Sequence, residues 1–208
     1  MPRRVDHLER RRQIADGVWR VTMRRGLGAV SLRRVADEIG ASVGMLQYHF
    51  ADVEAMLLFA LLTLSDNIGA RTSRGIALAE ADDPKQLVRA MLIEFLPLDQ
   101  ERVVEAHVAC AFLTRAAIDA RVSAYLRDAY DSRQEFLITQ FRRGGSKDPT
   151  REASRLAALV DGLTLRTLVG HHLPETALAT LDDDLDRLFD GPCFDGMAFQ
   201  QKPRDQQD

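Results

Sequence analysis

The sequence is poor in cysteine and has no long apolar stretch. Its 208 residues include only two cysteines, Cys110 and Cys193, whose separation matches no metal-site spacing. Such low cysteine use is typical of a reducing compartment, so we expect a cytoplasmic protein without a disulfide framework. No apolar run approaches the roughly 18 residues of a membrane span, and the charged N-terminus lacks the apolar core of a secretory signal. These absences predict that the protein has no membrane partner.

The sequence also lacks the short motifs of several large enzyme classes. It contains no glycine-rich phosphate loop, no G-x-S-x-G nucleophile motif and no H-E-x-x-H zinc motif. The acidic run Asp182-Asp183-Asp184 is most simply a solvated helix face rather than a cation site. We therefore expect no catalytic residue, no metal and no cofactor, with an all-helical enzyme that uses His107 as the alternative.

Positive charge is concentrated at the N-terminal end. The whole chain carries a net charge of −3, with 46% hydrophobic and 28% charged residues, a composition that allows a sizeable core. Residues 1–50 hold ten arginines and five acidic residues, a net charge of +5, so residues 51–208 carry −8. A basic end on an acidic protein indicates a nucleic-acid contact confined to one region. The plain alternative is a solvated basic helix.

The segment from Ser31 to Phe50, SLRRVADEIGASVGMLQYHF, predicts two short helices joined by a tight turn. Ser31 is a suitable N-cap, apolar residues follow at helical spacing, and Gly40 suits the left-handed conformation of a C-cap. Ser42 can then cap the second helix. Two helices joined by a short turn that contains glycine form the helix-turn-helix, whose second helix enters the major groove of DNA.

The string VADEIGASVGMLQYHF, with a basic helix before it and a long apolar helix after it, resembles the tetracycline-repressor (TetR) family. The resemblance is specific over residues 7–58. Two further strings, LVDGL at 159–163 and LPLDQERVVEAHVACAFL at 96–113, are similar to the BetI subgroup of that family. Membership implies an all-α, homodimeric transcription regulator that binds double-stranded DNA and responds to a small organic effector.

The resemblance and the helical periodicity together predict about nine helices. We expect a helix-turn-helix DNA-binding domain at 1–52, a ligand-binding and dimerisation domain at 53–190, and a disordered, polar tail at 191–208. Before the first helix, Arg3 and Arg4 lie on a flexible arm that can reach phosphates or a minor groove. Beyond the two motif helices, the expected helices cover about residues 7–25, 53–73, 84–95, 99–117, 119–143, 150–169 and 174–189.

Residues of the helix-turn-helix that its core does not need are expected at the DNA. Gln47 can pair with an adenine edge and Arg33 with a guanine edge, while Gly44 lets the helix backbone approach the duplex closely. By the resemblance, Tyr48 and His49 bind phosphate oxygens, with packing against the first helix as the alternative. The expected DNA-binding set is Ser31, Arg33, Ser42, Val43, Gly44, Met45, Gln47, Tyr48 and His49.

Two positions depart from the pattern of the family. Val53 stands where the family usually has a phosphate-binding lysine, and Gln47 stands where a tyrosine is more usual. We expect the loss of one phosphate contact to flatten the salt dependence of DNA binding by about one unit of log slope. The departure therefore bears on the affinity for DNA rather than on the type of function.

The helices after residue 53 are expected to enclose an effector site, because ligand sites in helical bundles are built from side chains of facing helices. Its expected lining, from the four helices between residues 53 and 143, is Phe59, Leu62, Phe95, His107, Cys110 and Tyr125. His107 and Cys110 are three residues apart and admit three interpretations. These are core packing, a pocket wall, or a metal site, for which two ligands are too few.

Leucines spaced like those of a coiled coil mark the last two helices. Paired with their symmetry mates, these helices are expected to form a dimer interface of Leu156, Leu159, Val160, Leu163, Leu178, Leu181, Leu185 and Leu188, with packing inside one chain as the alternative. The leading prediction is a dimeric repressor that binds a palindromic operator and is released by a small organic ligand. The alternative is a helical small-molecule sensor or carrier without specific DNA binding.

Overall fold

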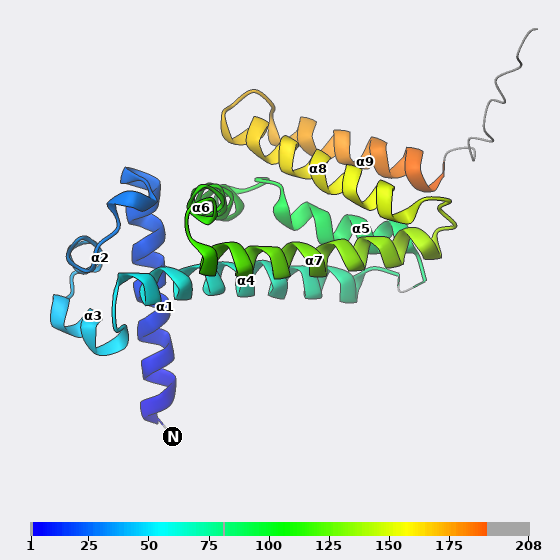
Figure 1. Cartoon of the computed structure of the whole chain (residues 1–208). Helices are drawn as coiled ribbons and strands as arrows, with labels where there is room; N and C mark the ends of the chain where they lie inside the picture. Colours follow the sequence, from blue (N-terminus) through cyan, green and yellow to red (C-terminus); the bar gives the residue numbers. More distant parts are fainter. Residues whose placement is uncertain (1, 81, 191–208) are drawn as a thin grey trace, which may run out of the picture.

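The computed structural model describes residues 2–80 and 82–190, with side chains from His7 onward, and this part of the chain is all-α (Figure 1). Over these residues no strand is formed. Nine α-helices and two 3-10 helices (η) make up the described part. They are α1 (Pro2–Arg25), η1 (Leu27–Ala29), α2 (Leu32–Ile39), α3 (Val43–His49), α4 (Val53–Leu78), α5 (Pro84–Leu92), η2 (Ile93–Phe95), α6 (Gln100–Ala116), α7 (Ala120–Arg143), α8 (Pro149–Leu168) and α9 (Pro174–Phe189).

A first core joins the N-terminal helices to the start of α4. Helix α1 packs against α2, α3, α4 and α6. Gly17 permits the close approach of α1 to α2, because a Cβ at this position would lie 2.5 Å from the side chain of Ile39. The largest fully buried side chains of this core are Ile14, Leu46, Met56, Leu61 and Phe112. Since Phe112 belongs to α6, the N-terminal core reaches into the second half of the chain.

A second core lies between α5, α7, α8 and α9 (Figure 1). Its largest fully buried members are Leu92, Leu96, Leu137, Phe141, Leu156, Leu181 and Leu185. Helix α4 contacts α1 along one part and α5 along another, so it is shared by the two ends of the molecule. The helix predicted at about residues 53–73 is therefore a continuous link between the two cores.

The predicted helices are present, with ends that differ by a few residues. Helix α1 begins at Pro2 rather than near His7, so the prediction of a flexible arm is wrong from residue 2 onward. Helix α4 continues to Leu78, five residues beyond its predicted end at Ser73. The side chains of Arg3 and Arg4, and the predicted tail at 191–208, lie outside the described residues.

Helix α4 is long and apolar enough to cross a membrane, contrary to the expectation that no segment approaches that length. The core helix of a globular protein passes the same test, and two observations place α4 in the bundle. It packs against α1, α5 and α6. Its Arg71 is paired with Glu94 and Glu105, two carboxylates that the fold buries. We therefore assign α4 to the helical bundle, where its first half is buried.

The leucines of α8 and α9 face the interior of their own chain. The members buried in the second core are Leu156, Val160, Leu163, Leu181 and Leu185, while Leu159 and Leu188 pack against it and Leu178 is half-buried. A side chain buried within one chain is unavailable to a second molecule. The prediction that the five buried residues form a dimer interface is therefore wrong, and the alternative of packing inside one chain is correct for them.

Candidate DNA-binding face and effector cavity

Two serine caps and one glycine fix the helix-turn-helix. The Oγ of Ser31 accepts the backbone N–H of Arg34 at 3.3 Å, and the Oγ of Ser42 accepts the backbone N–H of Met45 at 3.2 Å. Gly40 ends α2 at a φ of 66°, in the left-handed region that glycine tolerates. Each cap contributes about 0.5–2 kcal/mol to its helix. The predicted local structure of the motif is confirmed in each of these features.

Helix α3 buries one side and presents the other to solvent. Leu46 is buried in the first core, whereas the side chain of Tyr48 is 77% exposed. Gly44 has open space around the position that a Cβ would occupy. Of the nine residues expected at the DNA, the exposed ones are Arg33, Ser42, Val43, Gly44, Gln47 and Tyr48, and the half-buried ones are Ser31, Met45 and His49. The motif thus leaves these six side chains or positions open to solvent.

A ring cluster adjoins this face and matches the alternative of packing against the first helix for Tyr48 and His49. The imidazole of His7, on α1, lies 4.3 Å from the ring of His49 and 5.9 Å from the ring of Tyr48, between centroids. Tyr48 and His49 are themselves 5.2 Å apart and nearly perpendicular. The first described side chain of α1 therefore contributes to the face of α3. The alternative did not name His7, because this residue lies more than forty residues before Tyr48 and His49 in the chain.

One arginine of the run at residues 10–12 turns inward. The guanidinium carbon of Arg11 lies 4.7 Å from the ring centroid of Phe50 and 4.1 Å from that of Phe59. Such cation–π contacts stabilise by about 0.5–2 kcal/mol. Phe59 therefore packs with the first core beneath α1. Its predicted place in an effector site is wrong.

A cavity of about 470 Å³ opens between α4, α6, α7, α8 and the segment from α5 to η2. This volume lies in the range of about 300–1,000 Å³ that is usual for sites of small organic ligands. Its walls are mainly apolar, with Leu61, Leu64, Ile68, Met91, Leu113 and Leu126 among the contributors. The four helices predicted around an effector site are all present, and α8 adds a fifth.

The residues expected to line this cavity divide into two groups. Phe95 and Cys110 line it. The prediction is wrong for Leu62, which points to solvent, and for Tyr125, which packs against the first core. It is also wrong for His107, whose Nδ1 lies 2.8 Å from the backbone oxygen of Val103 in the same helix. The sequence indicated the right helices but not their rotation about their axes.

Buried charges that the sequence analysis missed form part of the cavity wall. Glu94 and Glu105 line the cavity and are 7% and 3% exposed. The Nε of Arg71 donates to Glu94 at 2.8 Å, and its Nη1 donates to Glu105 at 3.1 Å. Arg102 donates to Glu94 at 2.8 Å. The hydrogen bond to Glu105 raises the pKa of the Arg71 guanidinium further above its ordinary value, so Arg71 keeps its positive charge.

Two neutral polar groups also reach the cavity. Burial raises the pKa of the Cys110 thiol, and the nearby carboxylate of Asp161 raises it further. The same two causes raise the pKa of the Tyr130 phenol. Both groups therefore keep their protons at neutral pH. The thiol then acts as a small apolar group and the phenol as a hydrogen-bond donor.

Comparisons with known proteins agree with this architecture. A model of the C-terminal part of BetI-type transcriptional repressors matches residues 84–190. The HTH-type transcriptional regulator PksA of Bacillus subtilis is 31% identical over 180 residues, which cover 81% of this chain and 83% of PksA. The chain belongs to the TetR family. Its C-terminal part is of the BetI type, as the two strings at 96–113 and 159–163 predicted.

Other TetR-family relatives extend the comparison. The BetI regulator of Burkholderia mallei is 28% identical over 182 residues, which cover 86% of this chain and 93% of BetI. The crystal structure of a transcriptional regulator from Rhodococcus sp. Rha1 is similar with a TM-score of 0.79 and 31% identity, covering 87% of this chain and 96% of that one. The crystal structure of a regulator from Saccharomonospora viridis in complex with choline is similar with a TM-score of 0.78 and 25% identity. The match covers 86% of this chain and 96% of that one.

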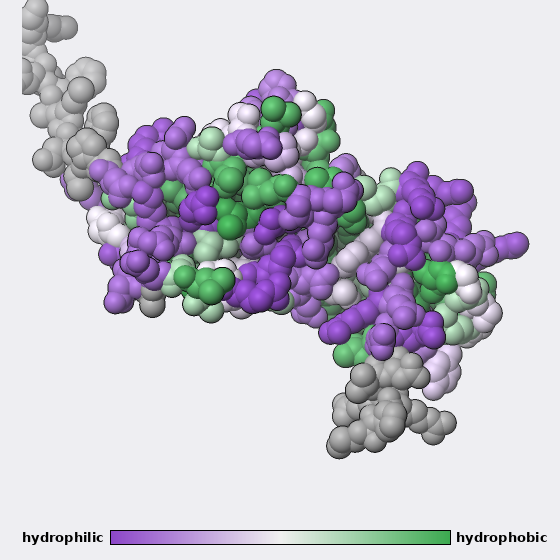
Figure 2. Space-filling view, turned by 180° about the vertical axis from the view of Figure 1, so that it is seen from behind, coloured by the Kyte–Doolittle hydropathy of each residue, from purple (hydrophilic) through white to green (hydrophobic). Residues whose placement is uncertain are grey.

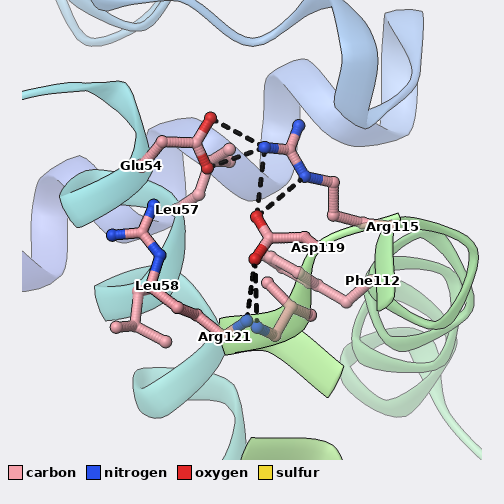
Figure 3. Close-up of a pocket in the computed structure, with 8 residues that line it drawn as sticks. Glu54, Leu57, Leu58, Phe112, Arg115, Asp119 and Arg121 are labelled. Atoms are coloured by element: carbon pink, nitrogen blue, oxygen red, sulfur yellow. Dashed lines mark hydrogen bonds and ion pairs between the residues drawn. The ribbon is translucent and has the colours of Figure 1, made fainter. Parts of the chain in front are cut away.

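In this TetR-family chain an arginine links the start of α4 to the corner between α6 and α7 (Figure 3). The Nη2 of Arg115 donates to both oxygens of Glu54 at 2.7 Å and to Asp119 at 3.2 Å. The hydrogen bond to Glu54 raises the pKa of Arg115. The hollow beside these residues measures only about 10 Å³, about the space of one water molecule. The cluster is therefore a structural link rather than a ligand site.

The capping role of Asp119 predicts a pH dependence of stability. Its carboxylate accepts the backbone N–H groups of Val122 and Arg121, and these bonds hold its pKa below the ordinary value. A lowered pKa in the folded state stabilises the protein above about pH 4, the unfolded value, and this stabilisation is lost as the pH falls through the folded pKa. We expect Asp119→Asn, which keeps a capping oxygen, to lose less stability on acidification than the unmodified chain, as urea unfolding at pH 6, 4 and 3 would show.

Asp83→Asn provides a parallel test at another cap. The pKa of Asp83 is also lowered, mainly by the backbone N–H of Gln86. Asp83→Asn should therefore also lose less free energy of unfolding than the unmodified chain when the pH is lowered from 6 to 3. Identical pH profiles for both variants and the unmodified protein would contradict the assignment of these carboxylates as charged caps.

Proposed function

We propose that this protein is a ligand-responsive transcriptional repressor that binds a palindromic operator as a homodimer and releases it when a small organic effector fills the cavity. The observation that carries the proposal is the course of α4. This helix begins directly after the exposed recognition helix α3 and lines the cavity farther along, from Leu61 to Thr72. In this arrangement residues 1–52 bind DNA, and residues 53–190 bind the effector and form the dimer.

The exposed face of the helix-turn-helix supports the DNA-binding part of the proposal. Arg33 and Gln47 are exposed and can reach base edges in the major groove. Tyr48, with its ring partners His49 and His7, can hydrogen-bond phosphate oxygens. The net charge of +5 in the first fifty residues favours approach to the polyanion.

Exposed apolar side chains at the end of α8 support the dimer. Leu165 on α8, which also lies at the rim of the cavity, Val169 at the C-cap of α8 and Leu173 at the N-cap of α9 are exposed, Val169 to 78%. Figure 2 shows hydrophobic residues on the surface of the C-terminal part, among hydrophilic ones. Contiguous exposed apolar residues mark interaction sites. A two-fold dimer through this face would set two copies of α3 about 34–36 Å apart, one turn of DNA.

The relatives support the remaining parts of the proposal. PksA and BetI are regulators rather than enzymes by their names, which supports a role without catalysis and a cytoplasmic location beside the DNA. The choline bound by the Saccharomonospora viridis regulator supports a small organic molecule as the effector. The sign of regulation, repression, follows the BetI-type model that matches the C-terminal part.

Operator binding tests the proposal directly. Fluorescence anisotropy of the full chain with the DNA upstream of its own gene, at several salt concentrations, should show binding that scrambled DNA does not compete. Tyr48→Ala should weaken this binding about tenfold, the value of one hydrogen bond of roughly 1.4 kcal/mol. The salt slope should not change, because tyrosine carries no charge and releases no counterion.

Leu78→Ala is the matched control, since Leu78 is exposed at the far end of α4. It should bind the operator as the unmodified chain does. Sedimentation of both variants as dimers would show that the loss lies in DNA contact. Equal, weak binding to both DNAs by a dimeric protein would favour the alternative of a small-molecule sensor without specific DNA binding.

A further inference from the structure

We propose that the effector is a neutral, mainly apolar organic molecule with one hydrogen-bonding group, rather than a quaternary ammonium ion or a carboxylate. The geometry that points to it is a cavity in which each charged wall residue already has an oppositely charged partner, and in which Phe95 and Tyr130 already hold the guanidinium of Arg133. The inference rests on the proposed function in one respect, that the cavity of about 470 Å³ is the effector site.

Each charged side chain of the described wall lies within ion-pair distance of an opposite charge. Glu94 and Glu105 pair with Arg71 and Arg102, and these arginines also bind the more exposed carboxylates of Glu101 and Asp99 outside the cavity lining. The remaining two, Arg133 and Asp161, face each other across α7 and α8 with a nitrogen–oxygen distance of 3.3 Å. In the described wall, each charged residue that an incoming ion could bind is therefore already paired with an opposite charge. A buried ion without a partner is costly by several kcal/mol, and a neutral ligand avoids this penalty.

The aromatic faces beside the cavity are occupied by the protein itself. The guanidinium carbon of Arg133 lies 5.0 Å from the ring centroid of Phe95 and 4.8 Å from that of Tyr130. Arg133 is only 7% exposed, so it is held between these rings. Aromatic faces are the usual means of binding a quaternary ammonium group. Here a ligand of that kind would have to displace Arg133.

An ionic ligand would also leave a like charge behind. A carboxylate that took Arg133 would lie beside Asp161, and a cation that took Asp161 would lie beside Arg133. A neutral polar group can instead use the uncharged wall. The Tyr130 phenol can donate, and the Thr164 hydroxyl, which donates to the backbone oxygens of Phe95 and Val160, keeps lone pairs to accept. An alcohol, ketone or amide on an apolar body fits this set.

Three ligands that share an octyl-type alkyl chain but carry a neutral, a negative or a positive head group test the proposal. The neutral fluorophore N-phenyl-1-naphthylamine would serve as the reporter for the full-length protein. We expect 1-octanol to displace it at a concentration at least tenfold below that of octanoate or octyltrimethylammonium, and choline not to displace it. Equal or better displacement by either ion, or no binding of the reporter, would overturn the proposal.

Two substitutions should change the charge preference in opposite directions. Asp161→Asn removes a carboxylate whose side chain is 48% exposed, and it should improve displacement by octanoate at least tenfold because Arg133 loses its counterion. Arg133→Gln should favour octyltrimethylammonium by a similar factor, because it frees Asp161 and both rings. Displacement by octanol should change less than threefold in each. Unchanged ionic preferences in both variants would contradict the role assigned to this pair.

Further measurements locate the reporter and separate this inference from the proposed function. Ala109→Trp, or Leu113→Trp if the first does not fold, should abolish reporter binding because both residues line the cavity. Ala124→Trp on the exposed side of α7 should not. Reporter binding that survives both cavity-filling variants would overturn the assignment of the site.

Operator binding by anisotropy is measured on the same proteins. Intact operator binding with an ionic preference refutes the ligand class alone, whereas a neutral preference without operator binding refutes the repressor alone.

Discussion

Arg71→Met is expected to destabilise the protein by about 3–5 kcal/mol, the usual result of removing one partner from a buried ion pair. Arg71 is the centre of the network beside the cavity, and its loss leaves Glu105 without its cation and Glu94 with Arg102 alone. Both carboxylates are almost fully buried, so the little solvent that reaches them replaces the guanidinium poorly. Urea unfolding followed by circular dichroism at neutral pH would measure the change in the free energy of unfolding.

Arg24→Met is the matched control for this prediction. Arg24 pairs with Glu38 at 3.0 Å, but its side chain is 67% exposed. Exposed ion pairs contribute about 0–1 kcal/mol, so this variant should unfold close to the unmodified chain. A loss below about 1 kcal/mol for Arg71→Met would contradict the buried network as a determinant of stability.

Gly44→Glu is expected to weaken operator binding at least about a hundredfold, since like charges placed together at an interface cost several kcal/mol. Gly44 lies in the first turn of α3, exposed, with open space where a side chain would begin. In the free protein the change should be neutral or stabilising, because glutamate is a better helix former than glycine and suits a helix N-terminus. Anisotropy titration and thermal unfolding on one preparation would measure both effects.

Gly44→Lys separates charge from bulk at the same position. Lysine adds a side chain of similar size with the opposite sign, so it should lose less than about tenfold in operator affinity and gain about one unit of salt slope. If both variants bind the operator like the unmodified protein, α3 does not face the DNA. If both lose affinity equally, close backbone approach rather than charge is the reason that glycine is required.

Features of the fold that depend on neighbours in sequence could be predicted well. Ser31, Gly40 and Ser42 act within one turn of their own positions, and all three cap as expected. Pro84 and Pro174 begin α5 and α9 as predicted, because proline suits the first turn of a helix. The helix-turn-helix could therefore be predicted from the amino-acid sequence alone.

Features that depend on helix rotation or on distant partners could not be predicted. A leucine seam at coiled-coil spacing indicates that a face is buried but not by what, and the seam of α8 and α9 proved to be internal. Arg71 gave no signal because its partners Glu94 and Glu105 lie 23 and 34 residues away. The same reason hid Arg133 and Asp161, which are 28 residues apart. The cavity was thus expected between the right helices with largely the wrong lining.

Two groups of ion pairs connect α4 and α6, so that these helices are expected to move together. Glu54 ties the start of α4 to Arg115 at the end of α6, and Arg71 ties the later part of α4 to Glu101 and Glu105 at the start of α6. The two anchor points on α4 are 17 residues apart, about 25 Å along the axis. Because α4 is held to α6 at both positions, a movement of α4 requires a movement of α6. A tilt of about 5° would move one anchor by roughly 2 Å relative to the other.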